Sequence, residues 1–165
     1  MISVLVVCTG NICRSSTGEG VLRHLAKQRG LSDRVRVASA GTHDYHVGDA
    51  PDRRSQKHAS KRGYDLSSQR AAQVSREDFH SYDYILAMDR GHLRILRGLQ
   101  PHGSRARLGL YMDASAKWKG EDVPDPYYGG VADFEQVLDM VEEASPLWLD
   151  RIEAELDPDR FKLQG

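Results

Sequence analysis

The feature that most constrains this fold is an apolar run at the N-terminus, followed at once by a polar loop and a helical pattern. Residues 2–7 (ISVLVV) are rich in β-branched side chains, which is typical of a strand buried on both faces of a parallel sheet. Helical spacing follows the loop, at Val21, Leu22, Leu25 and Ala26. The loop at residues 8–15 therefore aims backbone N–H groups and a positive helix end at one point. This arrangement predicts an anion-binding site.

Two side chains give this loop the means for chemistry. Cys8 begins it and Arg14 comes near its end, with five residues between them. Amide dipoles and a guanidinium stabilise a thiolate, which is the nucleophilic form of cysteine. A guanidinium also matches two phosphate oxygens at once. Ser15 can donate its hydroxyl to the sulfur and Asn11 can brace the loop, although a buried cysteine in an ordinary strand-to-helix turn is the simpler alternative.

The whole chain limits the class of protein. Its 165 residues and net charge of -1 predict a single domain, residues 1–165, with no affinity for nucleic acid or a membrane surface. The first strand begins directly after Met1, and no apolar run reaches transmembrane length, so we expect a cytoplasmic protein.

Cysteine usage limits the chemistry further. The two cysteines, Cys8 and Cys13, both lie in the loop, so they form no structural disulfide framework, and no spacing typical of a zinc site occurs. We expect no metal and no cofactor. Cys13 is either a small packed side chain or a partner for Cys8 under oxidation.

The rest of the chain alternates between strand and helix patterns. Strands are expected at residues 34–40, 82–88 and 105–111. Helices are expected at residues 16–29, 52–62, 90–99 and 133–156, with a short capped turn at 75–80. Leu93, Leu96 and Leu99 predict one buried helix face, and Pro146 predicts a kink or a restart capped by Ser145. The order predicts a doubly wound α/β domain, with a four-stranded parallel sheet, helices on both faces and the phosphate-binding loop after the first strand.

A carboxylate near the C-terminus completes the predicted chemistry. Asp125 lies in the long loop at residues 112–130, which follows the fourth strand, so it and the cysteine loop should meet at the carboxyl edge of the sheet. There, a carboxylic acid can protonate a departing oxygen and later take a proton from water. Asp122 is a competitor for this role, and Asp89 is either another site carboxylate or a helix cap. A simple turn at Asp125 is the alternative interpretation.

Two motifs now resemble a known family, the low-molecular-weight protein tyrosine phosphatases. They are Cys8-Thr9-Gly10-Asn11-Ile12-Cys13-Arg14-Ser15 and Asp125-Pro126-Tyr127-Tyr128. The resemblance implies a metal-free mechanism through a cysteinyl-phosphate, with Cys8 as nucleophile, Arg14 binding the phosphoryl group and Asp125 as general acid. Two positions depart from the family pattern: Ser16 stands where proline is usual, and Gln69 where many members carry a histidine.

The resemblance also implies the residues and partners around the phosphate. The implied substrate-binding residues are Thr9, Gly10, Asn11, Ile12, Cys13, Ser15, Tyr45, Tyr127 and Tyr128. Ser39 joins the network that supports the loop. The implied partner is a protein substrate that carries phosphotyrosine, with a tyrosine kinase as one candidate, and the expected state is a monomer or a weak dimer.

Four other functions compete with this one. An arsenate reductase of similar fold needs cysteines beyond Cys13 to pass a disulfide outward. A protein arginine phosphatase shares the nucleophile and the acid but typically has threonine in place of Ile12. A phosphocysteine carrier or a non-catalytic phosphate-binding module would have little use for both Arg14 and Asp125.

Overall fold

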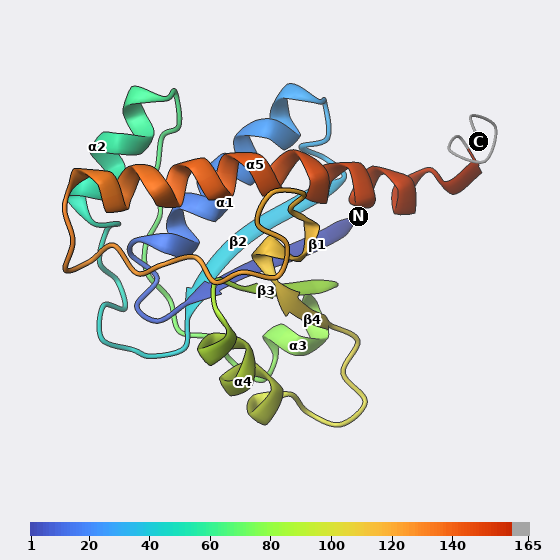
Figure 1. Cartoon of the computed structure of the whole chain (residues 1–165). Coiled ribbons are helices and arrows are strands. Elements are labelled where there is room, and N and C mark those ends of the chain that lie inside the picture. The colour runs from blue at the N-terminus through green and yellow to red at the C-terminus, as the bar shows by residue number, and fades with distance from the viewer. Residues whose placement is uncertain (160–165) are drawn as a thin grey trace.

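A parallel sheet forms the centre of the molecule (Figure 1). In the computed structural model, which describes residues 1–159, its four strands lie in the order β2-β1-β3-β4. Their bounds are β1 Ile2–Cys8, β2 Val35–Gly41, β3 Tyr84–Ala87 and β4 Arg107–Leu110. All three pairings are parallel. The predicted sheet is confirmed, while residues 160–165 of the predicted domain lie outside the described part of the chain.

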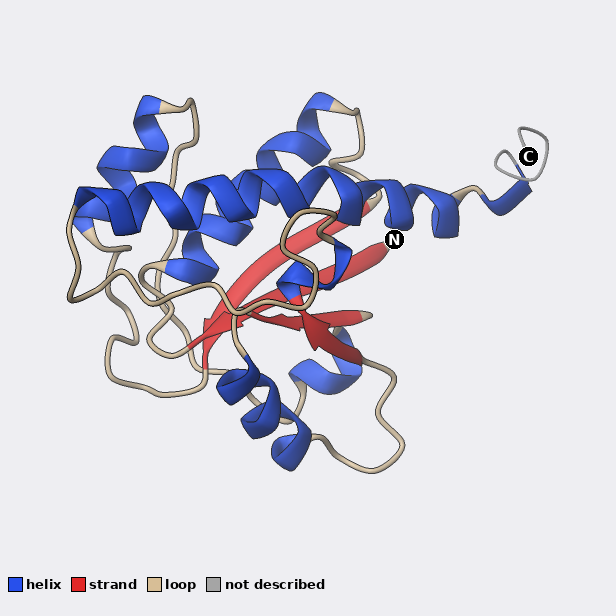
Figure 2. Ribbon diagram, in the orientation of Figure 1, coloured by secondary structure: helices blue, strands red, loops and turns tan. Residues whose placement is uncertain are grey.

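Helices cover both faces of this sheet, as predicted (Figure 2). Their bounds are α1 Arg14–Gln28, α2 Arg53–Lys61, α3 Asp78–Ser81, α4 Arg90–Leu99 and α5 Val131–Leu156, with a 3-10 helix η1 at Tyr111–Ala114. Helices α1 and α5 lie on one side of the sheet, and α3 and α4 on the other. Within residues 1–159, no helix combines the length and apolarity needed to cross a bilayer.

Strand β1 joins two hydrophobic cores because its side chains alternate between the faces. Val4 and Val6 belong to the core with α1 and α5, whereas Leu5 and Val7 belong to the core with α3 and α4. A methyl group on Gly18 of α1 would lie 3.0 Å from Val6. The glycine therefore lets α1 pack closely against β1, which holds the loop between them in place.

Three local expectations were wrong. Of the kink or restart expected at Pro146, the restart is wrong: helix α5 continues through Pro146, and the Ser145 hydroxyl donates to the Val141 carbonyl inside the helix instead of capping a new one. Leu99 is exposed because the buried face of α4 ends at Leu96. Strand β3 is shorter than expected because Tyr82 belongs to the end of α3, where its N–H donates to the carbonyl of Asp78.

Candidate active site

The loop between β1 and α1 turns its amides inward because its carbonyl groups are bound from outside. The carbonyl oxygens of Cys8, Thr9 and Ile12 accept backbone N–H groups from residues 42, 43 and 52. Asn11 has a left-handed backbone, with φ of 59°, which asparagine tolerates better than most residues. The N-terminus of α1, beginning at Arg14, closes the ring. The result is the cradle for an anion that the sequence predicted.

A chain of hydrogen bonds under the loop ends at the cysteine sulfur. The Asn11 side-chain amide donates to the hydroxyl oxygens of Ser15 and Ser39, each at 2.8 Å, and its oxygen accepts the N–H of Ala72 at 3.0 Å. The Ser15 hydroxyl lies 2.9 Å from the Cys8 sulfur. Because Ser15 already accepts from Asn11, its own proton is free to point at the sulfur. This contact places a hydrogen-bond donor at the Cys8 sulfur.

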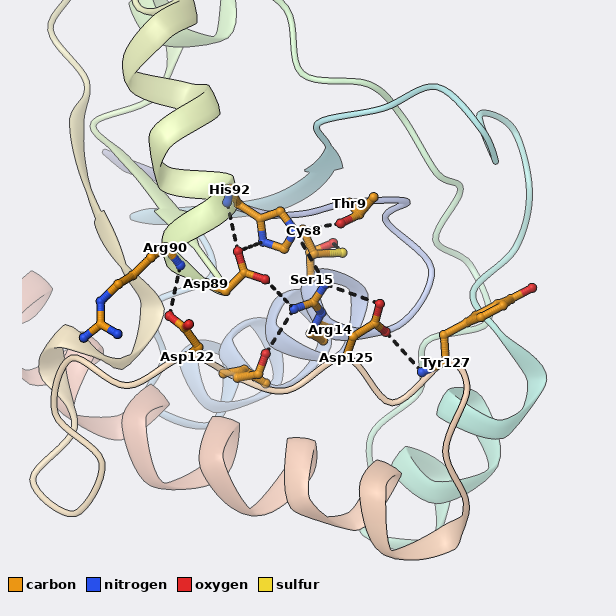
Figure 3. A network of polar contacts seen from close by, with 11 residues as sticks. Cys8, Thr9, Arg14, Ser15, Asp89, Arg90, His92, Asp122, Asp125 and Tyr127 are labelled. Carbon is orange, nitrogen blue, oxygen red and sulfur yellow. Dashed lines mark hydrogen bonds and ion pairs between the residues drawn. The ribbon is translucent and has the colours of Figure 1, made fainter.

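Arg14 is nearly buried and is held by two groups from distant parts of the chain (Figure 3). Its Nη1 donates to Asp89 Oδ2 at 2.8 Å and to the carbonyl oxygen of Val123 at 3.0 Å. Burial alone would raise the pKa of Asp89, but the backbone N–H of His92 and the Arg14 guanidinium hold it below its usual range. Asp89 is therefore a carboxylate that orients Arg14 as well as the cap of α4.

Asp125 and Asp122, the two candidates for the general acid, lie in different surroundings. Asp125 Oδ2 lies 3.7 Å from Arg14 Nη2, and half of the Asp125 side chain is exposed. Its Oδ1 accepts the N–H of Tyr127 at 3.1 Å, which fixes its direction (Figure 3). Asp122, in contrast, accepts the backbone N–H of Arg90 at 3.0 Å. Of these two candidates, Asp125 is the one beside Arg14.

A cleft of about 400 Å³ opens over the loop. Its walls combine predicted site residues with one additional histidine: Cys8, Thr9, Gly10, Ile12, Cys13, Arg14, Tyr45, His46, Asp125, Tyr127 and Tyr128. Asn11 and Ser15, which were also expected to bind substrate, lie behind the loop and do not line the cleft. No group of three or more His, Cys, Asp or Glu side chains within residues 1–159 is placed to hold a metal ion.

Comparison with known proteins identifies the family. The model of the family "Low molecular weight phosphotyrosine protein phosphatase" matches residues 3–158. The chain belongs to this family. Low molecular weight protein-tyrosine phosphatase A of Mycobacterium tuberculosis is 43% identical over 143 residues, which are 87% of this chain and 86% of that protein. The resemblance seen in the two motifs is thus confirmed.

Solved structures agree with the family. A protein tyrosine phosphatase from Entamoeba histolytica, crystallised with Hepes in its active site, superposes with a TM-score of 0.89 at 34% identity, covering 94% of this chain and 99% of that one. A Drosophila arginine phosphatase superposes with a TM-score of 0.84 at 30% identity, covering 90% and 96%. The fold of this phosphatase family is shared by both.

In this family member, His92 joins the site although the sequence did not point to it. Its Nε2 lies 2.7 Å from the Thr9 hydroxyl and 3.5 Å from Arg14 Nη2, while Nδ1 lies 3.1 Å from Asp89 Oδ1. Burial, and then the charge of Arg14, lower the pKa of His92 to about 4. A neutral ring with its proton on Nδ1 lets Nε2 accept from both neighbours. The available signal was its position three residues after Asp89.

The loop network of this phosphatase extends to a buried carboxyl group that the sequence did not reveal. Ser39 donates to Glu19 at 2.8 Å, and Arg23 pairs with Glu19 at 2.8 Å. Burial raises the pKa of Glu19 above its ordinary value. Gln69, at the position of the family histidine, donates to the carbonyl of Ser16 at 3.0 Å instead of to this network.

Cys13 packs as a small apolar side chain. It clusters with Ile12, Ala71 and Phe134, and burial raises its pKa to about 12. Both Cys13 and Cys8 are free thiols in this structure. Between the two interpretations of Cys13, these contacts support packing.

Proposed function

We propose that this protein hydrolyses phosphotyrosine on proteins, and aryl phosphate monoesters generally, through a cysteinyl-phosphate on Cys8. The observation that supports this most is the convergence of three groups on one cleft: the Cys8 sulfur, the Arg14 guanidinium and the Asp125 carboxyl group. Membership of the phosphatase family supports the same reaction.

The first step transfers the phosphoryl group to the protein. The Cys8 thiolate attacks phosphorus, the bond from phosphorus to the phenolic oxygen breaks, and the protonated carboxyl group of Asp125 gives its proton to that oxygen. Arg14 and the loop amides neutralise the charge on the phosphoryl oxygens. The Ser15 hydroxyl stabilises the sulfur before attack and again when it leaves.

The second step restores the thiolate. Asp125, now a carboxylate, takes a proton from water while the water oxygen attacks phosphorus, and the bond from phosphorus to sulfur breaks to release inorganic phosphate. Asp89 is unsuited to this role because Arg14 lowers its pKa and holds its oxygen at 2.8 Å. Asp125 is half exposed and lies 3.7 Å from Arg14 Nη2, so both a leaving group and water can reach it.

The substrate ring and its protein would meet the outer part of the cleft. Thr9, Gly10, Ile12 and Cys13 would surround the phosphoryl group, and the exposed aromatic rings of Tyr45, Tyr127 and Tyr128 would contact the phenyl ring and its flanking chain. The partner is therefore a phosphoprotein, with a tyrosine kinase as one candidate. A cytoplasmic location and a monomeric or weakly dimeric state stay predictions from the sequence.

Dephosphorylation of phosphoarginine is the alternative function, and an arginine phosphatase is among the structural neighbours. At the position where that enzyme typically has threonine, this chain has Ile12, whose branched apolar side chain lines the cleft. An apolar wall suits a phenyl ring better than a hydrated guanidinium group. The phenolic ester is therefore the favoured substrate.

Variants of the proposed nucleophile and of two carboxylates test the reaction. In EDTA, the wild type should hydrolyse p-nitrophenyl phosphate, Cys8→Ser should be inactive, and Asp125→Asn should lose roughly 10²–10⁴-fold in kcat. The loss should be larger on a phosphotyrosine peptide because its leaving group is the weaker acid. Asp122→Asn is the matched control and should change kcat by no more than about twofold.

Three results would contradict the proposal: turnover that requires added metal, unaltered turnover by Cys8→Ser, or equal losses in the two aspartate variants. A phosphoarginine peptide hydrolysed far faster than its phosphotyrosine counterpart would favour the alternative enzyme.

A further inference from the structure

A second groove lies on the other side of α4 from the catalytic cleft. It has a volume of about 430 Å³ and is lined by Arg90, Leu93, Arg94, Arg97, Leu108, Gly109, Leu110 and Asp113. It shares no lining residue with the catalytic cleft. Helix α4 separates the two: Asp89 and His92 approach Arg14, whereas the Arg90 side chain points away from Cys8 (Figure 3). We call this cavity the α4–β4 groove.

The α4–β4 groove carries an excess of positive charge, with three arginines against one aspartate. Within residues 1–159, Arg94 and Arg97 form no hydrogen bond or ion pair, and the Arg90 guanidinium donates only to the carbonyl of Gly120. Arg62, on another face, contacts three carboxylates. The one acid in the groove, Asp113, already accepts the N–H of Leu110 at 2.9 Å. An anionic ligand would supply the missing partners.

The spacing of these arginines matches that of an extended ligand. Residues 90, 94 and 97 share one helix face, and at 1.5 Å per residue they span about 10 Å along α4. In an extended peptide, alternate side chains are about 7 Å apart, close to the rise of about 6 Å between Arg90 and Arg94.

The opposite wall of the groove suits a polypeptide. In the described part of the chain, residues 1–159, strand β4 is at the edge of the sheet and pairs only with β3. Its residues Leu108 and Leu110 line the groove together with Leu93 of α4. These apolar side chains can contact the aliphatic parts of a peptide while its acidic groups meet the arginines.

We propose that the α4–β4 groove binds an extended acidic segment of the protein substrate, outside the phosphotyrosine itself. The identity of this segment as part of a substrate rests on the function proposed above. The groove then adds affinity for phosphoproteins with runs of aspartate or glutamate, and this contribution weakens at high ionic strength.

Charge reversal in the groove tests this proposal. Arg94→Glu/Arg97→Glu is compared with the control Lys57→Glu/Lys61→Glu, which changes two exposed lysines of α2, at the far end of the molecule (Figure 1). The substrates are phosphotyrosine peptides with and without a run of glutamates, joined by spacers of increasing length. For the wild type and the lysine variant, the glutamate run should raise kcat/KM about tenfold at the best spacing. For the arginine variant it should give no increase, while p-nitrophenyl phosphate turnover is unchanged in all three.

A binding measurement separates this proposal from the proposed function. A fluorescein-labelled glutamate-rich peptide without phosphate is titrated with each protein by fluorescence anisotropy, so no catalysis is needed. Weaker binding by the arginine variant alone, about tenfold, supports the groove even if phosphotyrosine is not hydrolysed. Equal binding by wild type and arginine variant, equal loss in the lysine variant, or a glutamate effect on kcat/KM that survives arginine reversal would overturn the proposal.

Discussion

Two variants of Asn11 separate the contribution of its side-chain hydrogen bonds from the backbone strain in the phosphate-binding loop. Its side chain makes three hydrogen bonds, to Ser15, Ser39 and the N–H of Ala72, and its φ is 59°. Asn11→Ala removes the three bonds and leaves a β-carbon in the left-handed region. Asn11→Gly removes the same bonds but has no β-carbon, so it adopts this conformation without strain.

The contacts give the size of each effect. A hydrogen bond contributes about 1 kcal/mol to the free energy of unfolding, so both variants should lose about 3 kcal/mol. Asn11→Ala should lose about 1 kcal/mol more, because the left-handed conformation is unfavourable for alanine. Both should lower kcat for p-nitrophenyl phosphate, since Ser15 loses the donor that directs its proton toward the Cys8 sulfur.

Urea unfolding followed by circular dichroism measures these losses. A double-mutant cycle that combines Asn11→Ala with Ser39→Ala should give a coupling energy of about 1 kcal/mol, because the two side chains share one bond. Equal stability of the alanine and glycine variants would refute the strain argument. A loss below about 1 kcal/mol in both would refute the network.

Three other perturbations follow from the same site. Because the pKa of His92 is about 4 when folded and near 6.5 when unfolded, the unfolded chain binds the extra proton between these values. The free energy of unfolding therefore decreases as pH falls from 6.5 to 4. In His92→Gln this decrease should be smaller by up to about 3 kcal/mol, as measured by urea unfolding at each pH. A methyl group on Gly41 would lie 2.5 Å from the Thr9 carbonyl oxygen, so Gly41→Ala should cost about 1–3 kcal/mol in thermal unfolding and weaken inhibition by phosphate. Because the pKa of Cys13 is about 12, iodoacetamide at neutral pH should modify Cys8 alone, as peptide mass spectrometry would report.

Much of the fold was predictable because local signals agreed with the tertiary structure. Helix α4 has the predicted bounds, since Asp89 caps its start and Pro101 follows its end. The errors occurred where tertiary contacts override local preference. Helix α5 continues through Pro146, where Ser145 bonds within the helix and to Tyr111.

Within the site, the sequence revealed the residues whose chemistry is evident from their type. Cys8, Arg14 and Asp125 are the predicted nucleophile, phosphate-binding residue and proton donor, and all three line one cleft. His92 was missed because its role depends on a contact with Thr9, which is 83 positions away. A histidine on an amphipathic helix gives no sign of such a partner.

The placement of Asp125 depends on backbone contacts that no side-chain motif encodes. Two residues earlier, Val123 is fully buried; its N–H donates to the carbonyl of Met88 at the end of β3, and its carbonyl accepts from Arg14. Val123 therefore fixes the loop both to the sheet and to Arg14. Because Asp125 follows this anchor by two residues, a displacement of Arg14 would also move the backbone that carries the predicted acid. The two halves of the site are thus joined through the main chain, because Arg14 bonds to the carbonyl of Val123 and Asp125 lies two residues farther along.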